Sequence, residues 1–149
     1  MKAVTWALLI VVGILLASFF LFIRPSFITP ILRDQARDIA QYVAGQISFM
    51  ARMRDQGAYA GQRVFHIEAG SDKLVEIVVM TNVNNGQVSP TGQVIVRVSS
   101  RIPPYSYGQA SANYTAPGCR VDQSTLFQGD IIITLKGDRI TVSNIIQKS

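Results

Sequence analysis

Residues 3–23 read AVTWALLIVVGILLASFFLFI, a run without charge or proline in which Thr5 and Ser18 are the conspicuously polar side chains. A helix of about 20 residues is long enough to cross a hydrocarbon core. The run is apolar on all sides rather than along one stripe, which indicates a helix with apolar material all round it. The sequence therefore predicts that lipid, or a sheath of similar helices, surrounds this segment.

A removable signal peptide is the first alternative, because Lys2 precedes the apolar run. The hydrophobic region of a signal peptide has about 7–15 residues and ends at a small-residue cleavage site. Here the apolar run continues to Ile23 and then meets Arg24 and Pro25. We therefore expect the segment to be retained.

The residues after the apolar run predict a second helical half of different character. Pro25 and Pro30 predict a kink in the region of residues 24–30. Beyond them, apolar residues recur at steps of three and four along one helical face: Leu32, Ala36, Ile39, Val43, Ile47 and Met50. Asp34 and Arg37 are spaced to pair across one turn of this amphipathic helix.

Joined through the prolines, residues 3–53 would form a rod of about 75 Å at 1.5 Å per residue. We expect residues 1–54 to be this N-terminal helix, serving as a filament core or a membrane span, and residues 60–149 to be a surface-exposed β-domain. The first half of the rod would enter a helical bundle and the second half would lie beneath the head. Periodicity leaves open an ordinary anchor followed by a stalk helix that packs on its own domain.

The C-terminal part changes to short alternating runs with turn signals between them. We predict strands at residues 63–69, 73–81, 94–100, 130–136 and 139–145. The turn at residues 70–72 favours a hairpin between the first two strands, and Gly137-Asp138 joins the last two as a second hairpin. The stretch 102–118 is rich in Pro, Gly, Tyr, Ser and Asn and is predicted to be a loop. The expected fold class is α+β, a long kinked helix followed by a small antiparallel β-sandwich-like domain.

Composition argues against several classes of function. Charged residues make up 15% of the chain and hydrophobic residues 48%. The net charge of +5 comes from 14 basic residues that are scattered singly, so we expect no nucleic-acid binding. Cys119 is the only cysteine and His66 the only histidine, which leaves no cluster for a metal site. We expect no catalytic activity, no cofactor and no metal.

The predicted loop contains two features that fit an extracellular domain. Asn113-Tyr114-Thr115 is an N-glycosylation sequon, so Asn113 is a possible modification site. Tyr105, Tyr107 and Tyr114 give the loop large, stiff, amphipathic side chains suited to adhesion. A loop that lies along the sheet is an equal alternative.

Charge counting across the apolar run opposes an outward-facing domain. Lys2 and the terminal amine stand on one side, and Arg24, Arg33 and Arg37 on the other, which would place the C-terminal side in the cytoplasm. The opposite orientation requires that a positively charged leader directs insertion and is then removed.

A long apolar N-terminal helix that becomes amphipathic and leads into a small β-rich domain resembles the type IV pilin superfamily, and most of all its archaeal adhesive pilins and archaellins. The likeness covers the whole architecture but is specific only for residues 1–53. Lys2-Ala3 before Val4-Thr5 is similar to the leader-peptidase site of that family. A cut there would leave a chain starting at Val4, whereas we expect a mature chain that starts at Met1. Bacterial members carry a glutamate just inside the apolar helix, and its absence here favours the archaeal branch.

The resemblance implies a structural subunit that waits in the membrane, polymerises through its N-terminal helix into an extracellular filament and serves in adhesion to an unknown surface ligand. The predicted contacts of the polymerisation core are Trp6, Leu9, Val12, Leu16, Phe19, Phe20, Leu32, Ile39, Val43 and Ile47. The alternative is a monomeric bitopic protein whose extracellular β-domain binds an envelope partner, and a membrane-tethered enzyme is a third reading.

Overall fold

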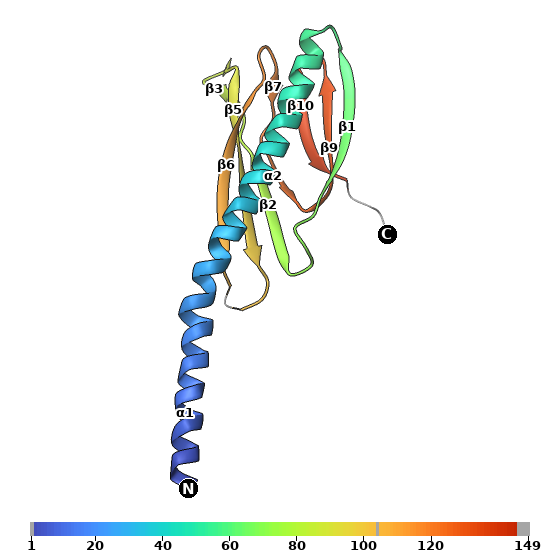
Figure 1. Ribbon diagram of the computed structural model, residues 1–149. Helices are drawn as coiled ribbons and strands as arrows, with labels where there is room; N and C mark the ends of the chain where they lie inside the picture. The colour runs from blue at the N-terminus through green and yellow to red at the C-terminus, as the bar shows by residue number, and fades with distance from the viewer. Residues whose placement is uncertain (1, 104, 146–149) are drawn as a thin grey trace.

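In a computed structural model of the chain, residues 2–103 and 105–145 are described, apart from the side chains of Lys2, Arg24 and Pro25. The chain begins with one long helix in three consecutive parts, α1 (Lys2–Ser18), η1 (Phe19–Ile23) and α2 (Arg24–Asp55). Its first half projects away from the rest of the molecule, and its second half lies against two β-sheets (Figure 1). We call the head the strands together with the part of α2, from Leu32 onward, that packs on them.

The proline region bends the helix without breaking it. Pro30 lies inside α2, and Pro25 stands in its first turn, directly after the five-residue π-helical segment η1. A proline offers no N–H to the carbonyl four residues earlier, which for Pro25 is Leu21 in η1. Ser26 Oγ donates to the carbonyl of Phe22 at 3.0 Å, a side-chain contact that bends helices. The predicted kink is thus a bend with a locally widened turn before it. The side chain of Pro25, like that of Lys2 at the predicted processing site, lies outside the described part.

Within residues 56–103 and 105–145, ten strands follow the helix. They are β1 (Ala60–Ile67), β2 (Lys73–Val79), β3 (Val83–Asn84), β4 (Gln87–Val88), β5 (Thr91–Ser100), β6 (Tyr107–Thr115), β7 (Arg120–Val121), β8 (Ser124–Phe127), β9 (Gly129–Lys136) and β10 (Arg139–Asn144).

The strands form two four-stranded sheets and a small hairpin. One sheet has the order β1-β9-β10-β7 and the other β6-β5-β2-β8, while β3 pairs with β4. All pairs are antiparallel except β10 with β7. The fold is therefore α+β, as predicted, with one long bent helix packed against two sheets.

A single hydrophobic core joins α2 to the inner faces of both sheets. On the helix it contains the predicted stripe, in which Ile39 is partly buried and the other five residues are 0–1% exposed. On the strands the buried residues alternate with more exposed ones, as at Val75, Ile77 and Val79 of β2. Asp34 and Arg37 lie on the outer surface of α2 and form the predicted ion pair at 3.7 Å.

Strand β6 lies directly on α2 because small residues face the helix. Gly108 is buried, and Ala110 and Ala112 are partly buried against the core. A Cβ atom at Gly108 would overlap the backbone of Leu32 and Arg33, so a larger residue there would push the strand away. At the other end of β6, the backbone N–H of Thr115 donates to Ser48 Oγ of α2 at 2.9 Å. Strand and helix therefore run side by side in the same direction.

Two predicted features of the β-domain were wrong. The strands at 63–69 and 73–81 do not form a hairpin, because β1 pairs with β9 in one sheet and β2 pairs with β5 and β8 in the other. Residues 70–72 carry the chain from one sheet to the other. The stretch 102–118 is not a loop throughout, because residues 107–115 form β6. The hairpin through Gly137-Asp138 is confirmed as β9 and β10.

Side-chain amides add hydrogen bonds between segments that are distant in the sequence. Asn82 is 3% exposed; its Nδ2 donates to the carbonyls of Ser89 (2.6 Å) and Cys119 (2.9 Å), and its Oδ1 accepts from the N–H of Val121 (2.9 Å). Asn144 of β10 both donates to and accepts from the backbone of Phe127 in β8, which ties the two sheets together.

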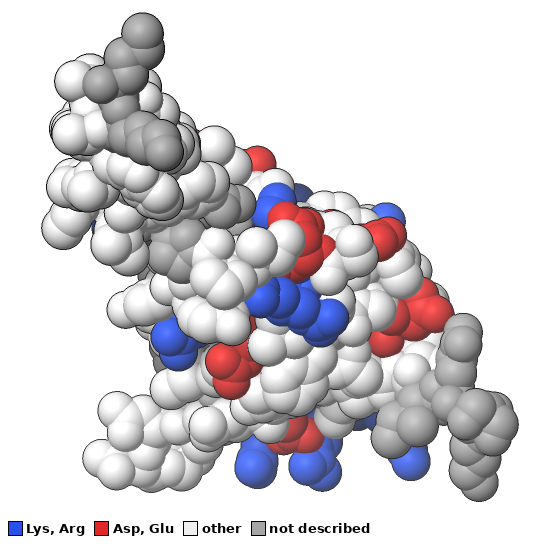
Figure 2. Space-filling view, turned by 90° about the horizontal axis from the view of Figure 1, so that it is seen from below, with Lys and Arg blue, Asp and Glu red and all other residues white. Residues whose placement is uncertain are grey.

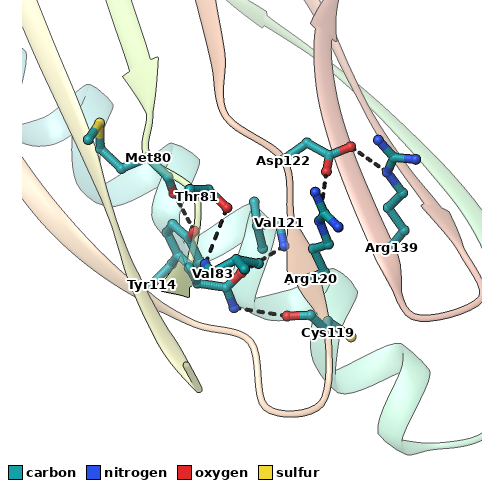
Figure 3. A network of polar contacts seen from close by, with 10 residues as sticks. Met80, Thr81, Val83, Tyr114, Cys119, Arg120, Val121, Asp122 and Arg139 are labelled. Carbon is teal, nitrogen blue, oxygen red and sulfur yellow. Dashed lines mark hydrogen bonds and ion pairs between the residues drawn. The ribbon is translucent and has the colours of Figure 1, made fainter. Parts of the chain in front are cut away.

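Charged side chains fasten the edge of the first sheet. Figure 3 shows Asp122 between Arg120 and Arg139. Arg139 Nε donates to Asp122 Oδ2 at 2.5 Å, and Arg120 Nε lies 3.5 Å from Oδ1. The short strand β7 is thereby held next to β10.

The contact between β6 and α2 can be tested with two glycine substitutions. Gly108→Ala should lower the free energy of unfolding by about 1–3 kcal/mol, because the added methyl group overpacks the interface. Gly45 lies exposed in α2 with open space around its Cβ position, so Gly45→Ala should raise stability by about 0.5–1 kcal/mol through helix propensity. Urea unfolding of the full chain in detergent, followed by circular dichroism, measures both. Equal effects of the two variants would contradict the close approach.

Candidate functional site

The largest functional feature is the surface of α1 and η1, which the chain itself leaves uncovered. From Ala3 to Ile23 every side chain is exposed except that of Ser18, which is partly exposed. None of the described strands lies beside this part of the helix (Figure 1). The predicted contacts here are all exposed, from 43% at Val12 to 67% at Trp6. They are Trp6, Leu9, Val12, Leu16, Phe19 and Phe20.

The helix is long and apolar enough to cross a membrane, and its apolar stretch is not buried against any described part of the chain. A core helix of a soluble protein can be equally long and apolar, but it is buried. Leaving this much hydrocarbon in water is costly, because burial of one such side chain contributes about 1.5–3 kcal/mol. The N-terminal half is therefore a membrane-insertion or signal-type segment by its physical properties.

The predicted core contacts further along the helix need a correction. Leu32, Val43 and Ile47 are 0–1% exposed within the chain's own core. They contact the chain's own β-domain and are not available to a second copy. Ile39 is partly buried against the same core. The one-sided periodicity of this half reflects packing on the head.

Two exposed apolar side chains beyond the span were missed. Phe27 is 69% and Ile31 56% exposed, and their spacing of four places them on one face of α2. They extend the uncovered apolar surface past Arg24 and up to the head. The spacing of four residues is a signal in the sequence, but Pro25 and Pro30 lie in the same stretch and favour a kink over a continuous helical face.

The three tyrosines proposed for adhesion have different positions. Tyr114 is 1% exposed, and its hydroxyl donates to the carbonyl of Met80 at 2.6 Å. Its ring passes over Gly92, where a Cβ atom would collide with it. Tyr114 is therefore a core residue, contrary to the adhesive role. Tyr105 and Tyr107 are 77% and 52% exposed, and the guanidinium of Arg97 lies 4.2 Å from the ring centroid of Tyr107.

The remaining predicted residues are also placed. Asn113 is exposed, but on strand β6 rather than in a loop, and its glycosylation stays a prediction. Cys119 is buried, and this burial raises the pKa of its thiol. His66 is exposed on β1, with Nδ1 2.7 Å from Oδ1 of its cross-strand neighbour Asp130. Within residues 2–103 and 105–145, no group of three or more His, Cys, Asp and Glu side chains could hold a metal ion.

Charges on the face seen from the N-terminal end of the helix are mixed. Figure 2 shows Lys and Arg side chains next to Asp and Glu side chains over this face, while the described helix surface nearest the viewer is uncharged. A field of one sign, which would attract nucleic acid, is not present on this face.

Comparisons with models of protein families, with curated proteins and with solved structures found no match. The long apolar helix followed by β-sheets is consistent with a pilin-like architecture. The exposed surfaces of the chain are therefore the evidence for its function.

The environment of α1 can be read from Trp6, the only tryptophan of the chain. In lipid vesicles the fluorescence of Trp6 should shift to the blue, because a helix of this length places it just inside the hydrocarbon boundary. Lipids labelled with nitroxide near the headgroup should quench it, and aqueous iodide should not. Red-shifted emission with strong iodide quenching would contradict membrane insertion.

The burial of Tyr114 predicts a dependence of stability on high pH. Burial raises the pKa of Tyr114 from 10.0 to about 12. The folded state thus favours the protonated hydroxyl, and its contribution to stability, about 2–3 kcal/mol, is complete below pH 10 and lost as pH rises towards 12. Unfolding should be measured between pH 9 and pH 12 for the wild type and Tyr114→Phe. The variant should lack this part of the pH dependence. If the free energy of unfolding falls in parallel with pH for both proteins, the assigned role of Tyr114 is contradicted.

Proposed function

We propose that this chain is a structural subunit of an extracellular type IV pilus-like filament of the archaeal kind, which polymerises through its N-terminal helix and displays the head for adhesion. Before assembly the subunit would be held in the membrane by the same helix. The proposal assigns no catalytic activity and no cofactor to the chain.

One observation carries the proposal: an apolar helical surface from Ala3 to Ile23 that is exposed on every side and joined end to end to a helix that packs one face against its own head. A single anchor in lipid satisfies this surface, and so does a bundle of identical helices. A bundle also explains why uncovered apolar residues continue to Phe27 and Ile31, beyond the length that a bilayer core needs.

The continuity of the helix supports display of the head on the outside of such a bundle. Because α2 is fixed in the core from Leu32 onward, the head is attached at one end of α1 and projects to the side (Figure 1). Copies that pack their α1 segments together would therefore place their heads in an outer layer. Repetition of many apolar contacts of about 1.5–3 kcal/mol each would make such a filament resistant to denaturants.

Two substitutions in α1 test assembly, and the second of them separates it from membrane anchoring. Val12→Asp should abolish filaments, because a carboxylate at the centre of an apolar helix costs about 2.5–3.5 kcal/mol even for membrane insertion. Gly13→Leu keeps the segment apolar and meets open space within the chain, so insertion should stay at the wild-type level. In a packed bundle the added bulk should shorten or abolish filaments, since overpacking costs about 1–3 kcal/mol per site.

Electron microscopy of sheared cell-surface material measures filaments, and extraction of washed membranes measures insertion. Val12→Leu is the matched control and should assemble. If sheared wild-type material contains no filaments while the detergent-solubilised chain is monomeric, the bitopic alternative replaces the filament. Intact filaments from Val12→Asp would refute burial of α1 in a bundle.

A further inference from the structure

We infer that the tip of the head between β5 and β6 is a second membrane contact. It would lie in the interfacial layer of the bilayer, beside the point where the helix leaves the membrane after Ile23. The residues concerned are Ile102, Tyr105 and Tyr107, together with Phe27 of α2. The inference rests on the membrane-inserted stage of the proposed function but does not depend on polymerisation.

The level of this tip along the helix follows from the packing of β6. Gly108 meets the backbone of Leu32 and Arg33, and Thr115 meets Ser48, so β6 runs in the same direction as α2. The residues before Gly108 must therefore lie towards the N-terminal end of the helix. Ser106 and Tyr107 line one hollow of about 480 Å³ together with Thr29 and Arg33, which agrees with this placement.

The depth of the tip can be estimated from the rise of helix and strand. Residues 3–23 span about 31 Å at 1.5 Å per residue, which matches a hydrocarbon core of about 30 Å. Leu32 and Arg33 then stand roughly 14 Å beyond Ile23. Tyr105 lies three residues before Gly108, so it returns by as much as about 10 Å towards the bilayer. This brings it within the interfacial layer, which is about 5–8 Å thick on each side.

The exposed side chains at this level are of the kinds that membrane interfaces favour. Ile102 is 48%, Tyr105 77%, Tyr107 52% and Phe27 69% exposed. Tyrosine combines an apolar ring with a polar hydroxyl and is enriched at the headgroup level. The guanidinium of Arg97 rests over the ring of Tyr107, which keeps a cation beside the tip where a phosphate group would meet it.

Backbone and side-chain hydrogen bonds fix the residues that follow the end of β5. The N–H of Ser100 donates to the carbonyl of Ser106 at 2.8 Å, and that of Arg101 donates to the carbonyl of Asp72 at 2.8 Å. Ser100 Oγ also accepts from the N–H of Ile102 at 3.2 Å and donates to its carbonyl at 3.0 Å. The exposure of Ile102 is therefore built into the fold, and little of its ordering entropy remains to be lost on contact with lipid.

The mixed charges seen in Figure 2 indicate that apolar insertion, and not attraction to anionic lipid, would hold the tip. The contact should thus form on neutral phosphatidylcholine and persist in high salt.

Nitroxide labels on the full chain, at one chain per phosphatidylcholine nanodisc, test this inference. Labels are attached at Tyr105→Cys, at Leu9→Cys in the span and at Gln87→Cys in the β3–β4 hairpin at the far end of the head. Cys119 is buried and its thiol pKa is raised, so the introduced cysteines take the label. Collision with oxygen, relative to a water-soluble nickel chelate, reports depth.

The expected result is a lipid environment at position 9, an interfacial one at position 105 with a loss of chelate collisions, and water at position 87. Adding Ile102→Asp should return the label at position 105 to water. If the label at position 105 collides with the chelate as often as the label at position 87, while position 9 is in lipid, the inference is overturned and membrane insertion stands. An unchanged label depth in the Ile102→Asp variant would also overturn it.

Two other outcomes identify different causes of failure. Water at position 9 would overturn the inference together with the membrane stage of the proposed function. Shielding of position 105 only when many chains share a vesicle would assign this surface to a second copy of the chain and overturn the lipid contact.

Discussion

The structure depends on one constraint, which is that the described part of the chain leaves the apolar surface of residues 3–23 uncovered. The head already has a closed core, formed by α2 and the inner faces of two sheets, and none of the strands that the structure describes reaches back along α1. Within the described residues, nothing excludes water from the apolar stretch of α1. The hydrophobic effect, which is proportional to the apolar area removed from water, therefore favours an apolar environment such as a lipid bilayer around this segment.

The helical half was predictable from sequence because its two parts carry different patterns. All-round apolarity in residues 3–23 and a one-sided stripe from Leu32 to Met50 correspond to an uncovered segment and a buried one. The prediction that both parts form the polymerisation core was wrong for the second part. Trp6 and Leu32 are both large and apolar, yet Leu32 is buried in the core of its own head. The two sequence patterns already differ in this respect. A one-sided apolar stripe has to be buried on one face only, and the β-domain buries that face.

The sheets were less predictable because strand partners are set by contacts distant in sequence. The turn at Gly137-Asp138 joins strands that do pair, whereas the turn at residues 70–72 joins strands that enter different sheets, and local turn chemistry is similar in both. Strand β6 was hidden by its Gly, Ala and Ser content, which is typical of loops. Those small residues are required by the approach of β6 to α2, and no local signal reports that approach. Tyr105 and Tyr114 likewise look alike in sequence, and only the position of β6 separates an exposed ring from a buried one.

The residues between Ser18 and Leu32 join the exposed first part of the helix to the part packed in the head, and the angle between these two parts can change there. From Leu32 onward the helix is fixed by the core, and up to Ser18 it is a regular α-helix that its surroundings would hold. Between them lie the π-helical turn of η1, the proline at residue 25 and the Ser26 bond to Phe22, which all weaken the regular ladder of backbone hydrogen bonds. Ile28, near the end of this stretch, packs against the core, and no described strand lies beside η1 (Figure 1). Bending of the helix therefore costs least here, so the angle of the head to a membrane or a bundle can change while the core and α1 each stay intact.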